Sequence, residues 1–272
     1  MHNNFWQSKT AVVCGASAGL GHALAEQLLQ VRVGRLVVLA RGPAVLEASQ
    51  RWADEFTETE VTGLTTDVCD IKQLNESAKS IQTRMGEVDL IINAVGRSDR
   101  GTLTELNPER LQDLFDVNVV SSLNVLQHLG PLLRRPNGKL VLIGSLASLF
   151  APRFLGGYAI AKHALAGLAQ QARLELAEQG IDVTLVCPGP IARVDAGQRY
   201  ADTNEGLPAA ALQPGGGAQI KGLDGPVLAR QILRAAAKGQ PILVRPRSAR
   251  LLWTVSSLSP ALGDWILRKK TS

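Results

Sequence analysis

The stretch KTAVVCGASAGLGHALAEQLL, residues 9–29, decides the fold of this chain. Its first part, Lys9 to Cys14, is a short apolar run that predicts a buried strand. Gly15, Gly19 and Gly21 follow, and an apolar-periodic helix comes next. A strand, a glycine turn and a helix in this order present free backbone N–H groups and the positive end of a helix dipole. The stretch therefore predicts a phosphate-binding turn. A plain tight turn remains the alternative, because this glycine spacing is less specific than GxGxxG.

Six further strand patterns alternate with helical stretches along the chain. They lie at Arg35–Ala40, Val61–Thr66, Asp89–Asn93, Lys139–Ile143, Ile181–Val186 and Pro241–Val244. Such alternation predicts right-handed βαβ crossovers and a parallel sheet with helices on both faces. A chain of 272 residues that is 45% hydrophobic can bury one sizeable core. We therefore expect a single α/β domain with a Rossmann-type doubly wound sheet, whose ligands bind outside the carboxyl ends of the strands.

The end of the second strand indicates the kind of dinucleotide. An acidic residue there would bind the ribose 2′-hydroxyl of NAD, but Ala40 occupies the place and Arg41 follows. The planar guanidinium suits the oxygens of a 2′-phosphate. Arg41 therefore favours NADP, with NAD the less expected cofactor. The alternative is an exposed arginine at a strand end.

Tyr158 and Lys162 lie four residues apart, and Tyr158 comes thirteen residues after Ser145. On a helix this spacing places the phenol and the ammonium on one face, roughly 6 Å apart. A nearby cation stabilises the phenolate and lowers the pKa of a tyrosine from about 10. The pair predicts an acid catalyst. Taken alone, it also fits a surface tyrosine beside a solvated lysine.

Together these residues resemble the short-chain dehydrogenase/reductase superfamily, in its compact single-domain branch, over nearly the whole chain. The resemblance implies a catalytic tetrad of Asn118, Ser145, Tyr158 and Lys162. It also implies cofactor contacts from Gly15, Ser17, Gly19, Leu20, Gly21, Arg41, Asp67, Val68, Asn93, Ala94, Tyr158, Lys162, Pro188, Gly189 and Ile191. Three positions depart from the family pattern. Cys14 and Ala94 replace a Thr and an Asn, and Arg193 replaces a Thr that contacts the nicotinamide carboxamide.

The function implied by the resemblance is NADP(H)-dependent interconversion of a carbonyl and an alcohol. Tyr158 would exchange the proton with the substrate oxygen, which Ser145 would hold in place. Lys162 would lower the pKa of Tyr158 and bind the nicotinamide ribose, and Asn118 would fix the helix geometry and a relay water. The alternative is a catalytically silent NADP-binding sensor or scaffold, against which the intact tetrad argues.

Substrate identity is expected to depend on a loop over the site. Residues 193–224 are rich in Gly and Pro and predict a mobile loop. The apolar side chains expected to line a pocket are Phe150, Phe154, Leu155, Leu207 and Ala209–Leu212. Such a pocket favours a small or lipid-like carbonyl over a charged sugar.

Residues 1–248 are expected to form the NAD(P)-binding catalytic domain, and residues 249–272 an amphipathic tail. Ser259 and Pro260 fit an N-cap and a first helical residue, ahead of an apolar face and the basic residues Arg268 to Lys270. Leu262, Trp265 and Ile266 form that face. The tail is too short and polar to span a bilayer, so it predicts peripheral membrane contact. Packing on its own domain or on a neighbouring subunit is the alternative.

An oligomer is predicted from the helix that follows Tyr158. Leu165, Leu168, Ala172 and Leu176 continue an apolar face along it. The corresponding helix of the resembling family often pairs between subunits, which implies a homodimer or homotetramer. Burial of this helix within its own domain is the alternative.

The cysteines and the net charge indicate which other classes of protein can be set aside. Cys14, Cys69 and Cys187 are odd in number and widely spaced, which fits neither a disulfide framework nor a zinc site, so we expect three buried thiols and no metal. The first residues lack the features of a secretion signal, so a cytoplasmic protein is expected. The net charge of +5 could indicate nucleic acid, but aromatic residues make up only 4%. An NADP site itself requires positive charge to bind the cofactor's phosphates, so no nucleic-acid partner is expected.

Overall fold

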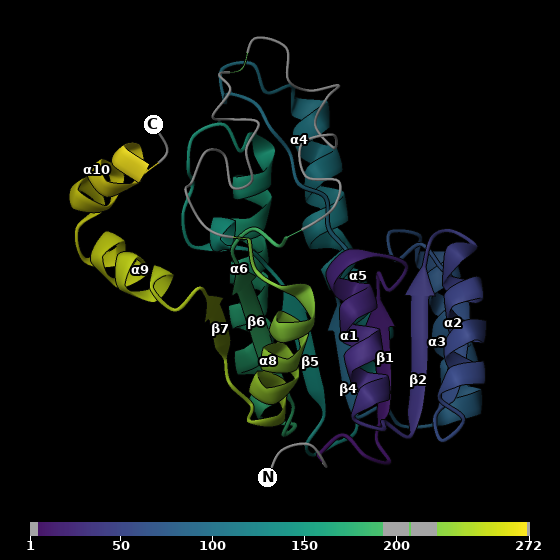
Figure 1. Cartoon of the computed structure of the whole chain (residues 1–272). Helices are drawn as coiled ribbons and strands as arrows, with labels where there is room; N and C mark the ends of the chain where they lie inside the picture. The colour runs from purple at the N-terminus through teal and green to yellow at the C-terminus, as the bar shows by residue number, and fades with distance from the viewer. Residues whose placement is uncertain (1–4, 193–206, 208–221, 271–272) are drawn as a thin grey trace.

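Seven parallel strands form one sheet in the computed structural model, which describes residues 5–192, 207 and 222–270 (Figure 1). The strands are β1 (Thr10–Cys14), β2 (Arg35–Ala40), β3 (Glu60–Thr65), β4 (Leu90–Asn93), β5 (Lys139–Ile143), β6 (Asp182–Pro188) and β7 (Ile242–Arg245). Each strand predicted from the sequence is present. The doubly wound α/β class is therefore confirmed.

The strand order reverses between β1 and β4. The order is β3-β2-β1-β4-β5-β6-β7, so the chain winds outward in both directions from this pair. Cys14 pairs with Asn93 in register, and the Ala94 N–H donates to the Cys14 carbonyl over 2.9 Å. Ligands of such sheets bind where the order reverses, outside the carboxyl ends of the strands. The residues that follow β1 and β4 therefore face the expected cofactor site.

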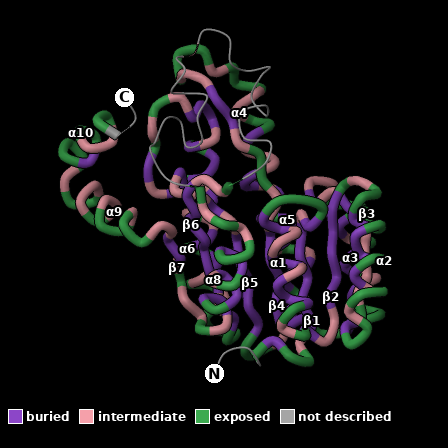
Figure 2. The backbone as a smooth tube through the Cα atoms, viewed as in Figure 1, coloured by how far each residue is buried: buried purple, intermediate pink, exposed green. Residues whose placement is uncertain are grey.

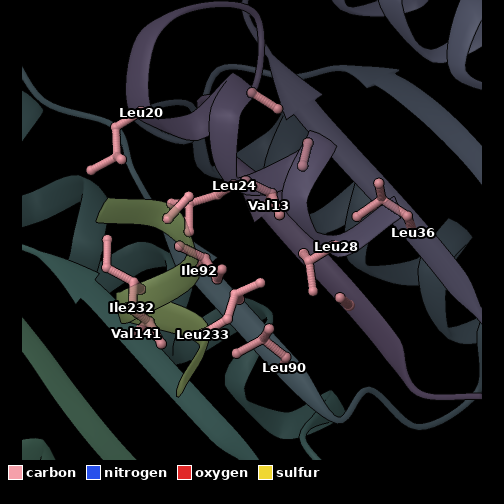
Figure 3. Close-up of a cluster of buried hydrophobic side chains, with 14 of the residues drawn as sticks. Val13, Leu20, Leu24, Leu28, Leu36, Leu90, Ile92, Val141, Ile232 and Leu233 are labelled. Atoms are coloured by element: carbon pink, nitrogen blue, oxygen red, sulfur yellow. The ribbon is translucent and has the colours of Figure 1, made fainter. Parts of the chain in front are cut away.

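Helices cover both faces of the sheet. One face carries α1 (Gly19–Gln30), α2 (Ala44–Glu55) and α8 (Gly225–Ala237). The other carries α3 (Ile71–Met85), α5 (Ser121–His128) and α6 (Gly157–Ala177). Successive residues of a strand point to opposite faces, so Val13 joins the first core and Val12 the second. Figure 3 shows the first core, where Leu24 of α1 lies near Ile232 of α8. Burial on both faces makes the sheet a rigid support for the site.

A π-helical turn interrupts the connection from β4 to β5. Helix α4 (Pro108–Phe115) runs through this turn, residues Asp116–Val120, directly into α5. Such insertions occur frequently at functional sites. Two short 3₁₀ segments, Gly130–Leu132 and Leu146–Ser148, complete the described helices before α6.

Two helices extend beyond the edge strand β7 (Figure 1). They are α9 (Ala249–Leu258), which the sequence analysis did not predict, and α10 (Pro260–Lys270). The predicted helix start at Pro260 is confirmed. No residue of α9 is buried, and Figure 2 shows both helices largely pink and green. This segment is less covered by the rest of the chain than the helices that flank the sheet.

The apolar face of α6 packs into the protein's own core. Leu165 and Ala172 are buried there, and Leu168 and Leu176 pack against the same cluster. Leu168 and Leu176 are only partly buried, so packing within the domain accounts fully for Leu165 and Ala172 and only in part for the other two. The dimer or tetramer expected from this face stays a prediction.

Candidate active site

The glycine turn after β1 brings the start of α1 against the backbone of the strand. Gly15 has a φ of +83°, and a Cβ placed on Gly21 would lie 2.1 Å from the Gly15 carbonyl oxygen. Any larger residue at position 21 would push α1 away from the turn. Ser17 and Gly19 are exposed on the turn, and Leu20 is buried beneath it. The turn leaves its backbone open to a ligand.

The N-terminus of α1 has no side-chain cap. Its N-cap residue is Ala18, and its first turn contains no acidic residue. By contrast, Asp70, Asn107 and Asp224 accept first-turn N–H groups of α3, α4 and α8. Orphan N–H groups at a helix start require a partner, and the helix dipole favours a negative one. The start of α1 is therefore suited to a phosphate.

Arg41 and Asp67 lie at the carboxyl ends of β2 and β3. Arg41 is exposed, and the Asp67 carboxylate accepts from the Cys69 N–H over 2.9 Å. Burial, and then Asp67, raise the pKa of the Cys69 thiol to about 11, while the Arg41 guanidinium opposes the shift. Arg41 and Asp67 therefore both lie close enough to the Cys69 sulfur atom to influence its charge. The buried Val68 is held by Asn124, whose amide donates to its carbonyl over 3.1 Å.

The turn after β4 is held by Asn93. This side chain is buried, donates to the Ser122 hydroxyl over 2.9 Å and accepts from the Val95 N–H over 3.1 Å. Ala94, which replaces an Asn of the family pattern, supplies only its backbone N–H to β1. The turn thus keeps its shape with a single asparagine.

Asn118 ties the π-helical turn to the segment after β4. Its amide nitrogen donates to the carbonyls of Arg97 and Leu114, both over 2.9 Å. Its amide oxygen accepts from the Arg97 N–H over 3.3 Å. A Cβ on Gly96 would lie 2.9 Å from this oxygen and 3.3 Å from Lys162 Nζ. Gly96 therefore lies against both Asn118 and Lys162, which the fold brings together from two helices.

Tyr158 and Lys162 stand one turn apart at the start of α6. Lys162 Nζ lies 5.8 Å from the centre of the Tyr158 ring and donates to the Ile143 carbonyl over 2.9 Å. Lys162 is buried, and burial lowers its pKa from 10.5 to about 8. The side chain therefore remains largely cationic at neutral pH. A buried cation beside a phenol favours the phenolate.

Ser145 follows β5 and is fixed by its own turn. Its hydroxyl oxygen accepts from the Ala147 N–H over 3.1 Å, and its N–H donates to the Ser148 hydroxyl over 3.2 Å. Ile143, the acceptor of Lys162, is two residues earlier. Ser145 and Lys162 therefore belong to the same end of β5. The sequence analysis did not single out Ser148, whose spacing of three residues is a capping-box signal.

The residues after β6 lie beside the end of β7. Pro188 ends β6, and the Gly189 N–H donates to the Arg245 carbonyl over 2.7 Å. Ile191 is partly buried and pairs with Leu223 in an isolated parallel bridge. This segment is the last cofactor position that the sequence analysis named. Arg193 lies outside the described residues.

An ion pair that the sequence analysis missed secures the approach to Tyr158. Arg110 of α4 donates to the buried carboxylate of Asp99 and, over 2.9 Å, to the Arg100 carbonyl. The adjoining Gly101 accepts from the Gly156 N–H over 3.1 Å, just before α6 begins. Asp99 and Arg110 are eleven residues apart around irregular chain, so no periodic signal connects them. They clamp the loop after β4 to the start of the helix that carries Tyr158.

The predicted substrate pocket is only partly within the described residues. Phe150 and Leu155 are buried, and Phe154 and Leu207 are partly buried. Residues 209–212 lie outside the described part of the chain, so the structure does not bring this set together. The described ranges contain no group of three His, Cys, Asp or Glu side chains that could hold a metal ion.

All three cysteines are free thiols. Cys14 and Cys187 are buried, as expected, and burial raises the pKa of each to about 12. Cys69 is only partly buried, so the expectation of three buried thiols was wrong for this residue. With pKa values raised in this way, the three side chains are protonated thiols at neutral pH rather than the nucleophilic thiolates.

Residues 9–205 match the family model described as short chain dehydrogenase. This match spans more than half of the 272 residues, so the chain belongs to the short-chain dehydrogenase family. The resemblance seen in the sequence is confirmed.

Two curated relatives and one solved structure are similar to the chain. Dehydrogenase/reductase SDR family member 7 of Mus musculus is 31% identical over 66% of this chain and 54% of the relative. The chain thus spans about half of that relative's length. Diacetyl reductase [(S)-acetoin forming] of Staphylococcus epidermidis is 29% identical over 67% of this chain and 71% of the relative. L-Sorbose reductase from Gluconobacter frateurii, complexed with NADPH and L-sorbose, matches 88% of this chain and 95% of its own. Its TM-score is 0.75 at 20% identity, which supports the fold alone.

Proposed function

We propose that this protein is an NADP(H)-dependent oxidoreductase that interconverts a carbonyl and an alcohol. The observation that carries the proposal is the buried Lys162, whose ammonium lies 5.8 Å from the Tyr158 ring centre. Taking a cation out of water is unfavourable, so an arrangement that keeps one against a phenol indicates acid–base chemistry more than packing.

The residues around the expected cofactor site fit a nicotinamide dinucleotide. The close contact of Gly21 with Gly15 and the uncapped start of α1 would hold the pyrophosphate. Arg41 would pair with a 2′-phosphate, which favours NADP, and Asp67 and Val68 would lie along the adenine ring. Pro188, Gly189 and Ile191 would border the nicotinamide. When bound, the cofactor supplies or accepts the hydride.

The proton chemistry belongs to the chain's own side chains. Tyr158 would donate a proton to the carbonyl oxygen during reduction and take it back during oxidation. Lys162 would hold the pKa of this phenol below its usual range through its charge. Ser145 would hydrogen-bond the same oxygen and keep it near the phenol.

Asn118 would act through the shape of the site. Its amide ties Arg97 and Leu114 together and lies beside Lys162, against Gly96. We propose that it positions the π-helical turn and a water that exchanges protons with Lys162.

We further propose a small or lipid-like apolar substrate. The buried Phe150 and Leu155 near the start of α6 support this class. The name of the similar diacetyl reductase, which refers to a small carbonyl compound, also supports a small substrate. Residues 1–248 would form the catalytic domain, and the protein would be a cytoplasmic homodimer or homotetramer. The described helices include none long and apolar enough to cross a bilayer.

The test is a screen of small carbonyls and alcohols with NADPH, NADP, NADH and NAD, in the wild type and in Tyr158→Phe. The substitution keeps the ring and removes the acid, so turnover should fall by about 10²-fold or more. Retained NADPH affinity, measured by fluorescence titration, controls for folding. A wild type that binds NADPH but turns over no substrate would favour a sensor or scaffold. Equal turnover by both proteins would remove Tyr158 from the proposed chemistry.

A further inference from the structure

The net positive charge of this protein comes from one segment at the end of the sequence. The whole chain has 29 Lys and Arg against 24 Asp and Glu. Residues 245–272 hold six of these cations, Arg245, Arg247, Arg250, Arg268, Lys269 and Lys270, and one acid, Asp264. Residues 1–244 therefore contain 23 of each sign, and the net charge of +5 lies wholly in the segment. The cofactor site does not account for this excess in the way expected from the sequence, because residues 1–244, which contain that site, are neutral overall.

The same segment exposes its apolar side chains. Leu251 and Leu258 of α9 are 71% and 83% exposed, and Trp265 of α10 is 50% exposed. These values are high for residues of this size, and they lie within fifteen residues of one another. Exposed apolar groups that cluster in this way mark an interaction site. Figure 2 shows the two helices with scarcely any buried residue.

The two helices support each other more than they contact the body of the protein. Gly263 of α10 is buried, and a Cβ there would lie 2.8 Å from the Ser256 Cα atom of α9. Their close crossing fixes a helical pair that leaves Leu251 and Leu258 uncovered. Lys269 Nζ lies 4.1 Å from the centre of the Trp265 ring, so a cation and an exposed indole share one patch.

The pair begins at the carboxyl edge of the sheet, where the candidate active site lies. It follows β7 directly, and the Arg245 carbonyl accepts from the Gly189 N–H. Figure 1 shows α9 and α10 extending outward from this end of β7. A surface that held the pair would therefore lie near the end of the sheet that carries Ser145 and Tyr158.

We propose that α9 and α10 bind the surface of an anionic lipid bilayer. Exposed Leu and Trp beside Arg and Lys are the features of a helix that lies in the membrane interface, with its apolar side chains among the acyl chains. A second protein copy would bury the apolar groups but would bring the positive charges of the two helical pairs against each other. Nucleic acid would neutralise the charge but would leave Leu251 and Leu258 uncovered. The bilayer satisfies both requirements, whatever reaction the active site performs.

The experiment is co-sedimentation of the full chain with phosphatidylcholine vesicles, with and without phosphatidylserine. The wild type should sediment with the anionic vesicles and remain in solution with the neutral ones. Leu251→Ser/Leu258→Ser should weaken binding about tenfold or more. Its matched control, Leu46→Ser/Leu174→Ser, changes two exposed leucines elsewhere and should bind as the wild type does.

A second pair of variants separates charge from apolar contact. Arg250→Gln/Lys269→Gln should weaken binding about tenfold or more, and salt should weaken the wild type, because lipid surface potentials are screened. Arg51→Gln/Arg84→Gln, on α2 and α3, should leave it unchanged. Each variant should retain NADPH affinity, which controls for folding. Absence of wild-type binding, equal binding to both vesicle types, or an oligomer that dissociates when Leu251 and Leu258 are changed would overturn the proposal.

Discussion

Buried charged groups are paired differently at the two ends of the parallel strands, which we call the amino edge and the carboxyl edge of the sheet. At the amino edge, the buried Asp89 accepts from the Thr10 N–H over 2.9 Å, from Lys9 Nζ over 3.1 Å and from Arg134 Nε over 2.9 Å. Lys139 and Asp182 form an ion pair at the starts of β5 and β6. The Asp89 carboxylate therefore has several partners, and its network joins three segments of the chain.

At the carboxyl edge, by contrast, several polar groups are left incompletely paired. Lys162 is buried but takes part in none of the described salt bridges, and burial lowers its pKa. The α1 N-terminus has no side-chain cap, and Asp99 Oδ2 is buried without a hydrogen-bond partner. Buried polar groups in native proteins are normally satisfied, so such exceptions call for a functional reason. The comparison indicates that the polar groups of the amino edge stabilise the fold, whereas those of the carboxyl edge form the candidate active site at some cost in stability.

The largest effect on stability is expected at the amino edge. Asp89→Ala would leave the buried Thr10 N–H unpaired and remove two ion pairs, which should lower the free energy of unfolding by about 3 kcal/mol. The expected loss of stability is no larger because the side chains of Lys9 and Arg134 are 36% and 42% exposed, and solvent screens their ion pairs with Asp89. Urea unfolding measures it, with the exposed Asp54→Ala as control. Turnover per folded molecule should stay the same. A loss below about 1 kcal/mol would break the contrast between the edges.

A smaller effect is expected for the clamp near Tyr158. Arg110→Met leaves the Asp99 carboxylate buried without its cation, which should destabilise the protein by about 2 kcal/mol. Because the clamp holds the segment before α6, turnover should also fall about tenfold. Asp99→Asn removes the charge but keeps an acceptor for Arg110, so its stability should stay within about 1 kcal/mol of the wild type. If Asp99→Asn lowered stability more than Arg110→Met does, the role of Arg110 in neutralising the buried Asp99 carboxylate would be contradicted.

The smallest effect on stability is expected for Arg41, which is exposed at the carboxyl edge. Arg41→Asp should change stability by less than about 0.5 kcal/mol. It should nevertheless weaken NADPH binding about tenfold and strengthen NADH binding, because the new carboxylate repels the 2′-phosphate and accepts from a ribose hydroxyl. Fluorescence titration of both cofactors measures the shift, with Arg51→Asp on α2 as control. A wild type that prefers NADH would contradict the reading of Ala40 and Arg41.

The fold and the positions of the motifs could be predicted because they depend on local sequence. Strand residues such as Val12 and Val13 are buried on both faces and give continuous apolar runs, which alternate with helices. The glycine turn and the spacing of Tyr158 and Lys162 are likewise set by neighbours in the chain. For this reason the seven strands and the closeness of this pair followed from spacing alone.

The features that escaped prediction depend on tertiary contacts. The Asp99 and Arg110 clamp joins the irregular segment after β4 to helix α4, and no pattern in either one points to the other. The face of α6 with Leu165 and Ala172 is apolar whether it meets its own sheet or another subunit, so periodicity could not decide between them. The low pKa of Lys162 follows from burial, which the sequence does not show.

The central claim is that Lys162 is kept for chemistry at the expense of stability. A pKa lowered from 10.5 to about 8 corresponds to roughly 3 kcal/mol of destabilisation by the buried cation. The folded pKa is the lower one, so this destabilisation is complete below pH 8 and disappears as the pH rises toward 10.5. Loss of the hydrogen bond to the Ile143 carbonyl would offset about 1 kcal/mol of any gain on substitution.

The most direct measurement is therefore the unfolding free energy and turnover of Lys162→Met, compared with the wild type at pH 7 and at pH 10. We expect the variant to be at least as stable as the wild type at pH 7, with that advantage shrinking at pH 10 and turnover reduced by about 10²-fold or more. A variant that is markedly less stable at pH 7, or that keeps wild-type turnover, would contradict the account.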